Sequence, residues 1–317
     1  MARIIFMGQP DRYGRLGHQS FSLITPLLLA EYFNEFFAPQ GYAYFANKYN
    51  NVIDYSLSQW ALKDITGKCQ FRFSQRNSID KHGNSKFDFC SPADFGEFCS
   101  IVRSEQNSKL DFVILQLPFD QFPGKLVRRL SKAMILDLHK IFSGILLTKG
   151  ELSDKSVKNI VIHIRRGDVS PERHPHWYLP DSFYERLILN IVNFTKDKVT
   201  ITIVTQGEFV VNMSSALEKY FCDGTVKVFT TSEPWINNCE IETFGLMLNA
   251  DVLIGGLSSF SILASLIKKG IHQISCVNRG QGEYPHPVNV GTEIYVDDSD
   301  QQMLLKLSNS IPLSFNA

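Results

Sequence analysis

The stretch Asn159-Ile-Val-Ile-His-Ile-Arg-Arg-Gly-Asp168 decides the fold of the C-terminal half of the chain. Its apolar beginning predicts a buried strand, which runs directly into two arginines, a glycine and an aspartate. Ligands of open α/β sheets bind beyond the carboxyl ends of the strands. Because the planar guanidinium of arginine matches phosphate oxygens, the stretch predicts an anion site at the end of this strand.

The two arginines of this stretch are expected to differ in role. Successive side chains of a strand point to opposite faces, so His163 and Arg165 share one face while Arg166 points away. We interpret Arg165 as the residue that grips a phosphate and Arg166 as the one that braces the loop, for example against Asp168. A surface salt bridge after the strand is the alternative.

A second stretch, Asp251 to Ser261, repeats the pattern of a strand, small residues and a helix. Ser258 or Ser259 is a natural N-cap, and free N–H groups beside serine hydroxyls form an anion cradle. An ordinary capped helix is the alternative. Because both stretches end strands of one predicted parallel sheet, they are expected to converge on a single diphosphate.

The spacing of apolar segments after residue 158 predicts strands that alternate with helices, which is typical of a doubly wound parallel sheet. The acidic cluster at 297–300 is interpreted as a solvated helix start, not as a metal site. The predicted strands are 159–164, 199–204, 226–229, 251–254, 272–277 and 293–296, and the predicted helices are 180–194, 208–220, 239–249, 259–268 and 300–308.

The N-terminal half is less regular. A strand over 3–7, a glycine-containing loop and a helix over 21–37, with Pro26 inside it, predict a second anion cradle or simply a tight βα turn. Residues 40–110 are rich in aromatics without clear periodicity, which favours an irregular core or a sugar-binding cleft. A strand over 111–116 and a helix over 125–147 follow.

The length and composition of the chain limit its possible domain organisation and binding partners. A length of 317 residues predicts two domains, and the polar stretch 148–158 places their boundary, giving domains 1–150 and 151–317. Lysine plus arginine equals aspartate plus glutamate at 32 each, so no global field attracts nucleic acid. The six cysteines are widely spaced and no signal peptide or membrane span is evident, which indicates reduced thiols and a cytoplasmic location or at most peripheral association with the inner membrane surface.

Four motifs together resemble the fucosyltransferases that form α1,2, α1,6 and protein O-linked fucose. His-x-Arg-Arg-Gly-Asp at 163–168 is similar to the signature of this group, and Gly14 to Gln19 is similar to its Gly-(Arg/Gly)-(Leu/Phe)-Gly-Asn-Gln loop. Ser258 to Ser261 resembles the Ser-Ser-Phe-Ser motif. Tyr178 to Tyr184 resembles the Leu-Pro-x-x-Tyr-Tyr segment of α1,2-fucosyltransferases, and the four motifs stand in family order.

The resemblance implies an α/β fold of the GT-B type, in which two Rossmann-like domains face a cleft. It implies that the C-terminal domain holds GDP-fucose and that the N-terminal domain, with its glycine loop, serves the acceptor. The implied reaction is transfer of fucose to a hydroxyl of a glycan acceptor, through an α1,2 linkage, with inversion at the anomeric carbon. Neither a metal nor another cofactor is required.

The resemblance also assigns roles to residues. Arg165 corresponds to the arginine that binds the β-phosphate, and Glu242 lies near the position of an acidic residue that pairs with guanine. Glu172 and Asp168 are the nearest candidate general bases, and His18, which stands where the family has asparagine, is a third. Ile262 and Leu263 also depart from the family, where bacterial members carry tryptophans. The further residues implied in the donor site are His163, Arg166, Gly17, Ser258, Ser259, Phe260 and Ser261.

Other readings of the same residues remain open. The fold is compatible with a different sugar nucleotide donor or with a protein or peptide acceptor. A Rossmann oxidoreductase that uses the 14–19 loop for NAD is a second class, although that loop lacks Gly-x-Gly-x-x-Gly. A non-catalytic carbohydrate- or peptide-binding protein that retains an inactive donor site is a third.

Overall fold

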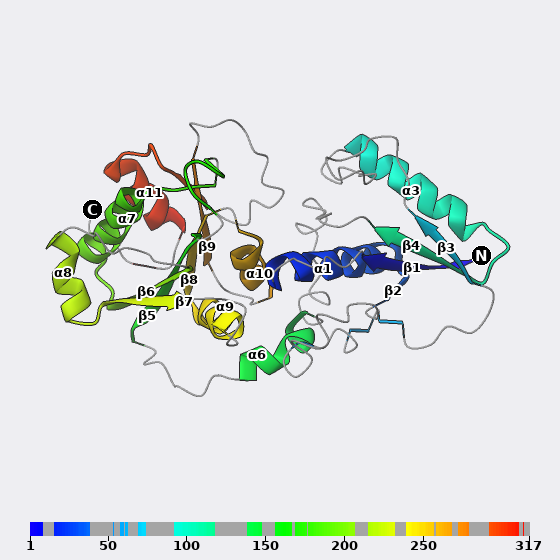
Figure 1. Cartoon of the computed structure of the whole chain (residues 1–317), viewed down its shortest axis with the longest axis horizontal. Helices are drawn as coiled ribbons and strands as arrows, with labels where there is room; N and C mark the ends of the chain where they lie inside the picture. The colour runs from blue at the N-terminus through cyan, green and yellow to red at the C-terminus, as the bar shows by residue number, and fades with distance from the viewer. Residues whose placement is uncertain are drawn as a thin grey trace. The chain divides into compact units, whose positions relative to one another are not determined.

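The chain forms two compact α/β units in the computed structural model, Met1–Ile145 and Leu146–Ala317 (Figure 1). They are called unit 1 and unit 2 below. The division lies close to the predicted boundary after residue 150. The structure describes residues 1–8, 16–38, 53, 58–59, 61–62, 69–73, 92–117, 138–147, 156–166, 169–175, 177–206, 215–231, 239–256, 258–267, 272–278, 292–310 and 313.

Unit 2 is built on a six-stranded parallel sheet in the order β10-β9-β8-β5-β6-β7. All six strands were predicted, and the observed bounds differ from the predicted ones by no more than two residues. The strands are β5 (Lys158–Ile164), β6 (Val199–Gln206), β7 (Val226–Thr231), β8 (Val252–Gly255), β9 (His272–Val277) and β10 (Thr292–Tyr295).

The strand order shows how the chain winds through this sheet. It starts at the centre with β5 and moves outward through β6 to β7, then returns to the other side of β5 and moves outward again through β8, β9 and β10. This is the doubly wound order of a Rossmann fold. The winding direction reverses between β5 and β8, which pair side by side. The crevice at the carboxyl ends of these two strands is therefore the topological switch point.

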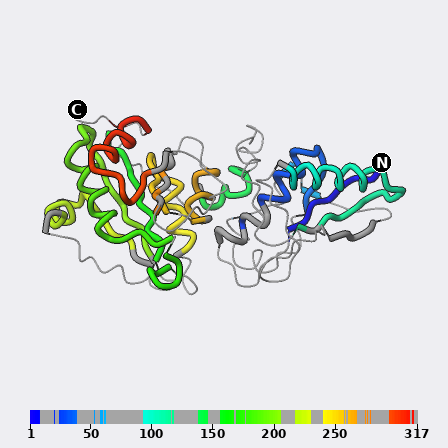
Figure 2. The backbone as a smooth tube through the Cα atoms, turned by 90° about the horizontal axis from the view of Figure 1, so that it is seen from above, coloured from blue at the N-terminus to red at the C-terminus, as the bar shows by residue number. Residues whose placement is uncertain are grey.

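Helices cover both faces of this sheet. Strand β5 is buried on both sides from Ile160 to Ile164, as expected for a parallel sheet between helical layers. Figures 1 and 2 show α7 and α11 on one side and α9 and α10 on the other, and α8 packs against α7. The helices are α7 (Asp181–Phe194), α8 (Ser215–Cys222), α9 (Cys239–Asn249), α10 (Ser259–Ile267) and α11 (Asp300–Ser310).

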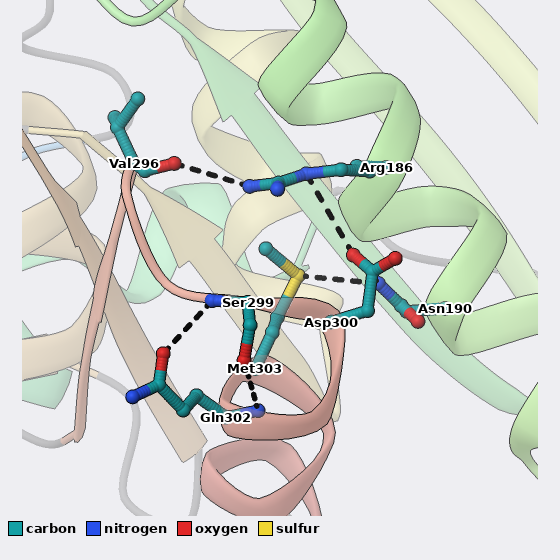
Figure 3. Close-up of polar contacts among 7 residues, drawn as sticks. All are labelled: Arg186, Asn190, Val296, Ser299, Asp300, Gln302 and Met303. Atoms are coloured by element: carbon teal, nitrogen blue, oxygen red, sulfur yellow. Dashed lines mark hydrogen bonds and ion pairs between the residues drawn. The ribbon is translucent and has the colours of Figure 1, made fainter.

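Polar contacts attach the last helix to α7 (Figure 3). The Nδ2 of Asn190 donates to Asp300 Oδ1 at 3.1 Å, and the Nη2 of Arg186 donates to the carbonyl of Val296 at 3.1 Å. Ser299 and Gln302 form a reciprocal capping box, in which each side-chain oxygen accepts from the backbone N–H of the other residue at 3.3 and 2.9 Å.

The acidic cluster that precedes α11 is a helix start, as predicted, but it is not fully solvated. Asp298 is only 5% exposed. Its Oδ2 accepts from the backbone N–H of Tyr295 at 2.7 Å and from Lys306 Nζ at 2.6 Å. The turn between β10 and α11 thus buries a carboxylate, because its backbone and lysine partners offset the cost of desolvation.

Unit 1 contains a smaller parallel sheet in the order β2-β1-β4-β3. The predicted strands β1 (Arg3–Gly8) and β4 (Phe112–Leu117) are confirmed. The expectation of an irregular core over 40–110 was wrong in part, since β3 (Cys69–Phe73) and α3 (Pro92–Gln106) lie there. Most of the predicted helix 125–147 lies outside the described residues, and α6 (Ser143–Leu147) forms its end.

The helix predicted over 21–37 ends earlier than expected. Helix α1 (Leu16–Phe33) is followed by the short strand β2 (Phe36–Phe37), which pairs with β1. Asn34 adopts the left-handed conformation at φ 54°, and the N–H groups of Asn34 and Glu35 donate to the carbonyls of Glu31 and Ala30. These two bonds form a Schellman motif, which stops the helix although the apolar pattern continues.

The same helix also begins earlier than predicted. Gly17 and His18, which were expected in a loop, lie in the first turn of α1. Ser20, in the next turn, is fully buried although its side chain is polar. The remainder of the predicted glycine loop, residues 9–15, lies outside the described part of the chain.

A buried carboxylate connects three segments of unit 1. Glu35 is 5% exposed and follows the Schellman turn. Its side chain accepts from Arg3 Nε at 2.8 Å, from the backbone N–H of Ile4 at 3.1 Å and from Gln106 Nε2 at 2.8 Å. Glu35 thereby ties the end of α1 to β1 and to the end of α3.

Replacing Glu35 with alanine is expected to lower the free energy of unfolding of unit 1 by about 2–3 kcal/mol, because the buried N–H of Ile4 loses its acceptor. Urea denaturation followed by circular dichroism measures the change. Glu97→Ala, at an exposed position of α3, is the matched control and should stay within about 0.5 kcal/mol of wild type. Equal losses in the two variants would contradict this role of Glu35.

Candidate functional site

The two stretches singled out in the sequence meet at the switch point of the unit 2 sheet. His163 of β5 is in register with Gly255 of β8. The imidazole of His163 is buried and contacts the ring of Phe260 edge-on, with centroids 5.9 Å apart. Phe260 in turn packs against Phe244 of α9 at 5.2 Å. The 163–168 and 258–261 segments therefore lie close together where their residues are described, and their sharing of one diphosphate stays a prediction.

The two arginines at the end of β5 are not equivalent, as predicted. Arg166 continues the side of Ile160, Ile162 and Ile164, which pack into the core beneath α7. Its Nη1 donates to the carbonyl of Arg165 at 3.0 Å, and its Nη2 donates to the carbonyl of Leu179 at 2.7 Å and pairs with Asp181. Arg166 therefore braces the start of α7. Asp168, the partner suggested by the sequence, lies outside the described residues.

Arg165 lies in a different environment. Its guanidinium carbon sits 5.0 Å from the ring centroid of Trp177. The indole of Trp177 is stacked on the imidazole of His174, with centroids 4.8 Å apart and planes 3° from parallel. Trp177 was not among the predicted site residues, because it lies just before the 178–184 motif and in a segment without helical or strand periodicity. The only available signal was an aromatic residue among the polar residues between β5 and α7.

Helix α10 begins at the carboxyl end of β8. The Oγ of Ser258 accepts from the backbone N–H of Phe260 at 3.3 Å, so Ser258 is the N-cap, one of the two serines that the sequence offered for this position. Ser261 is fully buried and donates its hydroxyl to the carbonyl of Ser258 at 3.1 Å. The side chain of Ser259 is outside the described part. A capped helix start carries partial positive charge, which favours an anion there.

Gly255, at the end of β8, lets this helix start approach the strand closely. A Cβ placed on Gly255 would lie 3.0 Å from Ser261 Oγ and 3.2 Å from its Cβ. Gly256 has no such part, since a Cβ there would lie 3.4 Å from Leu179 Cδ1, an ordinary van der Waals contact. Since Ser261 is buried and cannot easily move, Gly255 is required for the close approach of α10 to β8.

The acidic residues of α9 differ in exposure. Glu242, which the resemblance places near guanine, is exposed on the helix surface. Glu240, also in the first turn, is 8% exposed. Both precede Phe244, whose ring contacts Phe260. The first turn of α9 therefore belongs to the same side of the sheet as His163 and Phe260.

Of the three candidate general bases, only Glu172 has a side chain that the structure describes. Glu172 is exposed in the loop between β5 and α7, and a hydrogen bond from the side chain of Ser170 holds its carboxyl pKa below the ordinary value. A lowered pKa makes Glu172 a weaker base at neutral pH. The His18 side chain and the whole of Asp168 lie outside the described part of the chain.

No set of three or more His, Cys, Asp or Glu side chains among the described residues is arranged to hold a metal ion. Likewise, none of the described helices combines the length and apolarity that a membrane crossing needs.

Comparisons with known proteins give little beyond this geometry. No family model matches the sequence, and no curated protein matches it. Among solved structures the chain is similar to the ADP-heptose lipopolysaccharide heptosyltransferase II of E. coli, at 12% identity and a TM-score of 0.33. The similarity covers 57% of this chain and 51% of that protein, or about half its length. The function is therefore argued from the residues of the switch point.

Gly255→Ala is expected to lower the free energy of unfolding by about 1–3 kcal/mol, because the new methyl group overpacks against Ser261. Chemical denaturation of unit 2 measures the change. Adding Ser261→Ala removes the nearest clashing atom, so the double variant should lose less stability than the sum of the two single variants.

Gly245→Ala is the matched control for this substitution. Gly245 lies inside α9, and no atom approaches within 4 Å of the Cβ that alanine would add. Alanine has the higher helix propensity, so this variant should be as stable as wild type or more stable by up to about 1 kcal/mol. Strict additivity of Gly255→Ala and Ser261→Ala would refute the proposed close approach.

Proposed function

We propose that this chain is an inverting glycosyltransferase that moves fucose from GDP-fucose to a hydroxyl of a glycan acceptor, through an α1,2 linkage, without a required metal. Unit 2 is the donor-binding unit in this proposal, and unit 1 serves the acceptor. The observation that carries the proposal is the pairing of His163 with Gly255 at the switch point, with Arg165 two residues beyond.

The position of these residues supports a nucleotide ligand. In open α/β sheets, ligands bind outside the carboxyl ends of the strands at the switch point. Here that place combines an arginine, a buried histidine and the capped start of α10. A diphosphate suits this set, because guanidinium N–H groups and the backbone N–H groups of a helix start both donate to phosphate oxygens.

The choice of GDP-fucose among sugar nucleotides rests on the four-motif resemblance. Arg165 stands in the β-phosphate position of that pattern, and Phe260 and Ser258 stand where the nucleotide is contacted. Arg166 supports the same site indirectly, since its contacts with Leu179 and Asp181 fix the loop that follows β5.

The chemistry required of the donor site is electrostatic. As the bond to fucose breaks, negative charge develops on the departing GDP, and donors aimed at that charge lower the barrier. In this proposal Arg165 and the start of α10 supply those donors. The acceptor hydroxyl must also lose a proton as it attacks. Glu172, Asp168 and His18 remain the candidates for that step, and the lowered pKa of Glu172 makes it a weaker base at neutral pH than an ordinary glutamate.

A nicotinamide-dependent oxidoreductase is the second candidate, because the strand order of unit 2 is the one found in dinucleotide-binding domains. Two residue positions speak against it. The turn after β5 carries Arg165 and Arg166 where such domains have Gly-x-Gly-x-x-Gly, and β6 ends at Gln206 where they place an acidic residue for the ribose.

Calorimetry of nucleotide binding tests the donor assignment. Wild-type protein should bind GDP more tightly than UDP or dTDP, and Arg165→Ala should weaken GDP binding about a hundredfold and abolish transfer, because charge-assisted hydrogen bonds are lost. Arg173→Ala, which removes an exposed arginine from the same loop, is the matched control and should bind GDP as wild type does.

Three results would contradict the proposal. Tighter binding of UDP or dTDP than of GDP would point to another sugar nucleotide. Near-normal GDP binding and turnover in a folded Arg165→Ala variant would remove Arg165 from the site. Absence of both transfer and hydrolysis of GDP-fucose by wild-type protein that still binds GDP would favour a non-catalytic glycan-binding protein.

The transfer rate is expected to be unchanged by EDTA, because the cationic groups of the chain are proposed to neutralise the departing diphosphate. The measurement is the initial rate of fucose transfer before and after chelation. Strict dependence on added Mn²⁺ or Mg²⁺ would overturn the metal-free mechanism and leave the donor assignment standing.

A further inference from the structure

We propose that Trp177 is a positioning residue that holds the guanidinium of Arg165 in place for the β-phosphate of the donor. This inference rests on the proposed function and adds to it a residue that neither the motifs nor the comparisons single out. Trp177 lies in the loop between β5 and α7, one residue before the 178–184 motif.

The first support is the geometry of two consecutive contacts, which join three side chains. The guanidinium carbon of Arg165 lies over the indole of Trp177 at 5.0 Å from the ring centroid. The indole is stacked on the imidazole of His174 at 4.8 Å with the planes 3° from parallel. An arginine this close to the face of a tryptophan is attracted by the ring quadrupole.

The second support is that the loop carrying Trp177 is fixed at several points. The backbone N–H groups of Trp177 and Tyr178 both donate to the carbonyl of His174, at 2.9 and 3.0 Å. The carbonyl of Tyr178 accepts from Asn278 Nδ2, at the end of β9, at 3.4 Å. Arg166 holds the next residue of the loop through the carbonyl of Leu179. The indole is therefore presented to Arg165 by a braced backbone.

This arrangement favours phosphate binding for an entropic reason. An arginine side chain has many rotamers, and ordering it on binding costs free energy. A contact made through the ring face attracts the charge without using the N–H donors, which lie in the guanidinium plane. Trp177 can therefore order the side chain of Arg165 before the donor binds.

The test compares GDP with GMP, which lacks the β-phosphate, by calorimetry on the full chain. Trp177→Leu should weaken GDP binding about tenfold and leave GMP binding near the wild-type value, since only the β-phosphate contact depends on the ordered arginine. Trp177→Phe keeps an aromatic face and should restore most of the GDP affinity. His174→Ala keeps the indole without its stacking partner and should give an intermediate loss.

Tyr178→Leu is the matched control, because its ring lies over Arg166 and not over Arg165, with the guanidinium carbon 4.6 Å from the centroid. Its ratio of GDP to GMP affinity should equal that of wild type. Equal weakening of GDP binding and GMP binding in Trp177→Leu would mean that Trp177 has a merely structural role, and would overturn the inference. Wild-type affinity for both nucleotides in that variant would overturn it as well.

Three further outcomes keep the test decisive. If circular dichroism shows that Trp177→Leu is unfolded, the ratio of GDP to GMP affinity is measured in folded His174→Ala instead. A wild-type ratio in His174→Ala would then overturn the inference. Failure of the wild-type chain to bind GDP would overturn the proposed donor and this inference together. Normal GDP binding by wild type with an unchanged ratio in every variant would overturn only the role of Trp177.

Discussion

The pleat of β5 is the constraint on which the rest of unit 2 depends. Alternate residues of this strand enter the core beneath α7, and Arg166 continues that side to reach Asp181. His163 takes the other side and contacts Phe260. A shift of one residue in the pairing would exchange the two sets. The packing that buries the sheet therefore also assigns different tasks to two neighbouring arginines.

The sequence predicted unit 2 far better than unit 1, for physical reasons. Parallel strands buried on both faces leave uninterrupted apolar runs, and the helices between them have apolar faces. In unit 1, the end of α1 depends on the left-handed conformation of Asn34, which an apolar pattern running on to Phe37 conceals. Strand β3 (Cys69–Phe73) does alternate polar with apolar residues, but five residues are too few to stand out among polar neighbours.

The candidate site was predictable to the extent that it follows from strand ends. Two segments at the carboxyl ends of neighbouring parallel strands must lie close together, and His163 and Phe260 do. The partners within the loop after β5 were not predictable. Arg166 pairs with Asp181 at the start of α7, and Trp177 reaches Arg165 only because the loop folds back. Such contacts depend on backbone geometry, which single-sequence patterns do not encode.

The contacts of Arg166 also have a consequence for how such a protein can change over generations. By holding Leu179 and Asp181, this arginine brings the two ends of the loop after β5 together. Once the ends are fixed, a longer loop costs little, since doubling its length adds only about 0.6 kcal/mol of closure entropy. Apart from Trp177 and its supports, and from the candidate bases Asp168 and Glu172, the segment is thus free to accept insertions and new side chains. Its sequence can diverge while the switch point stays unchanged.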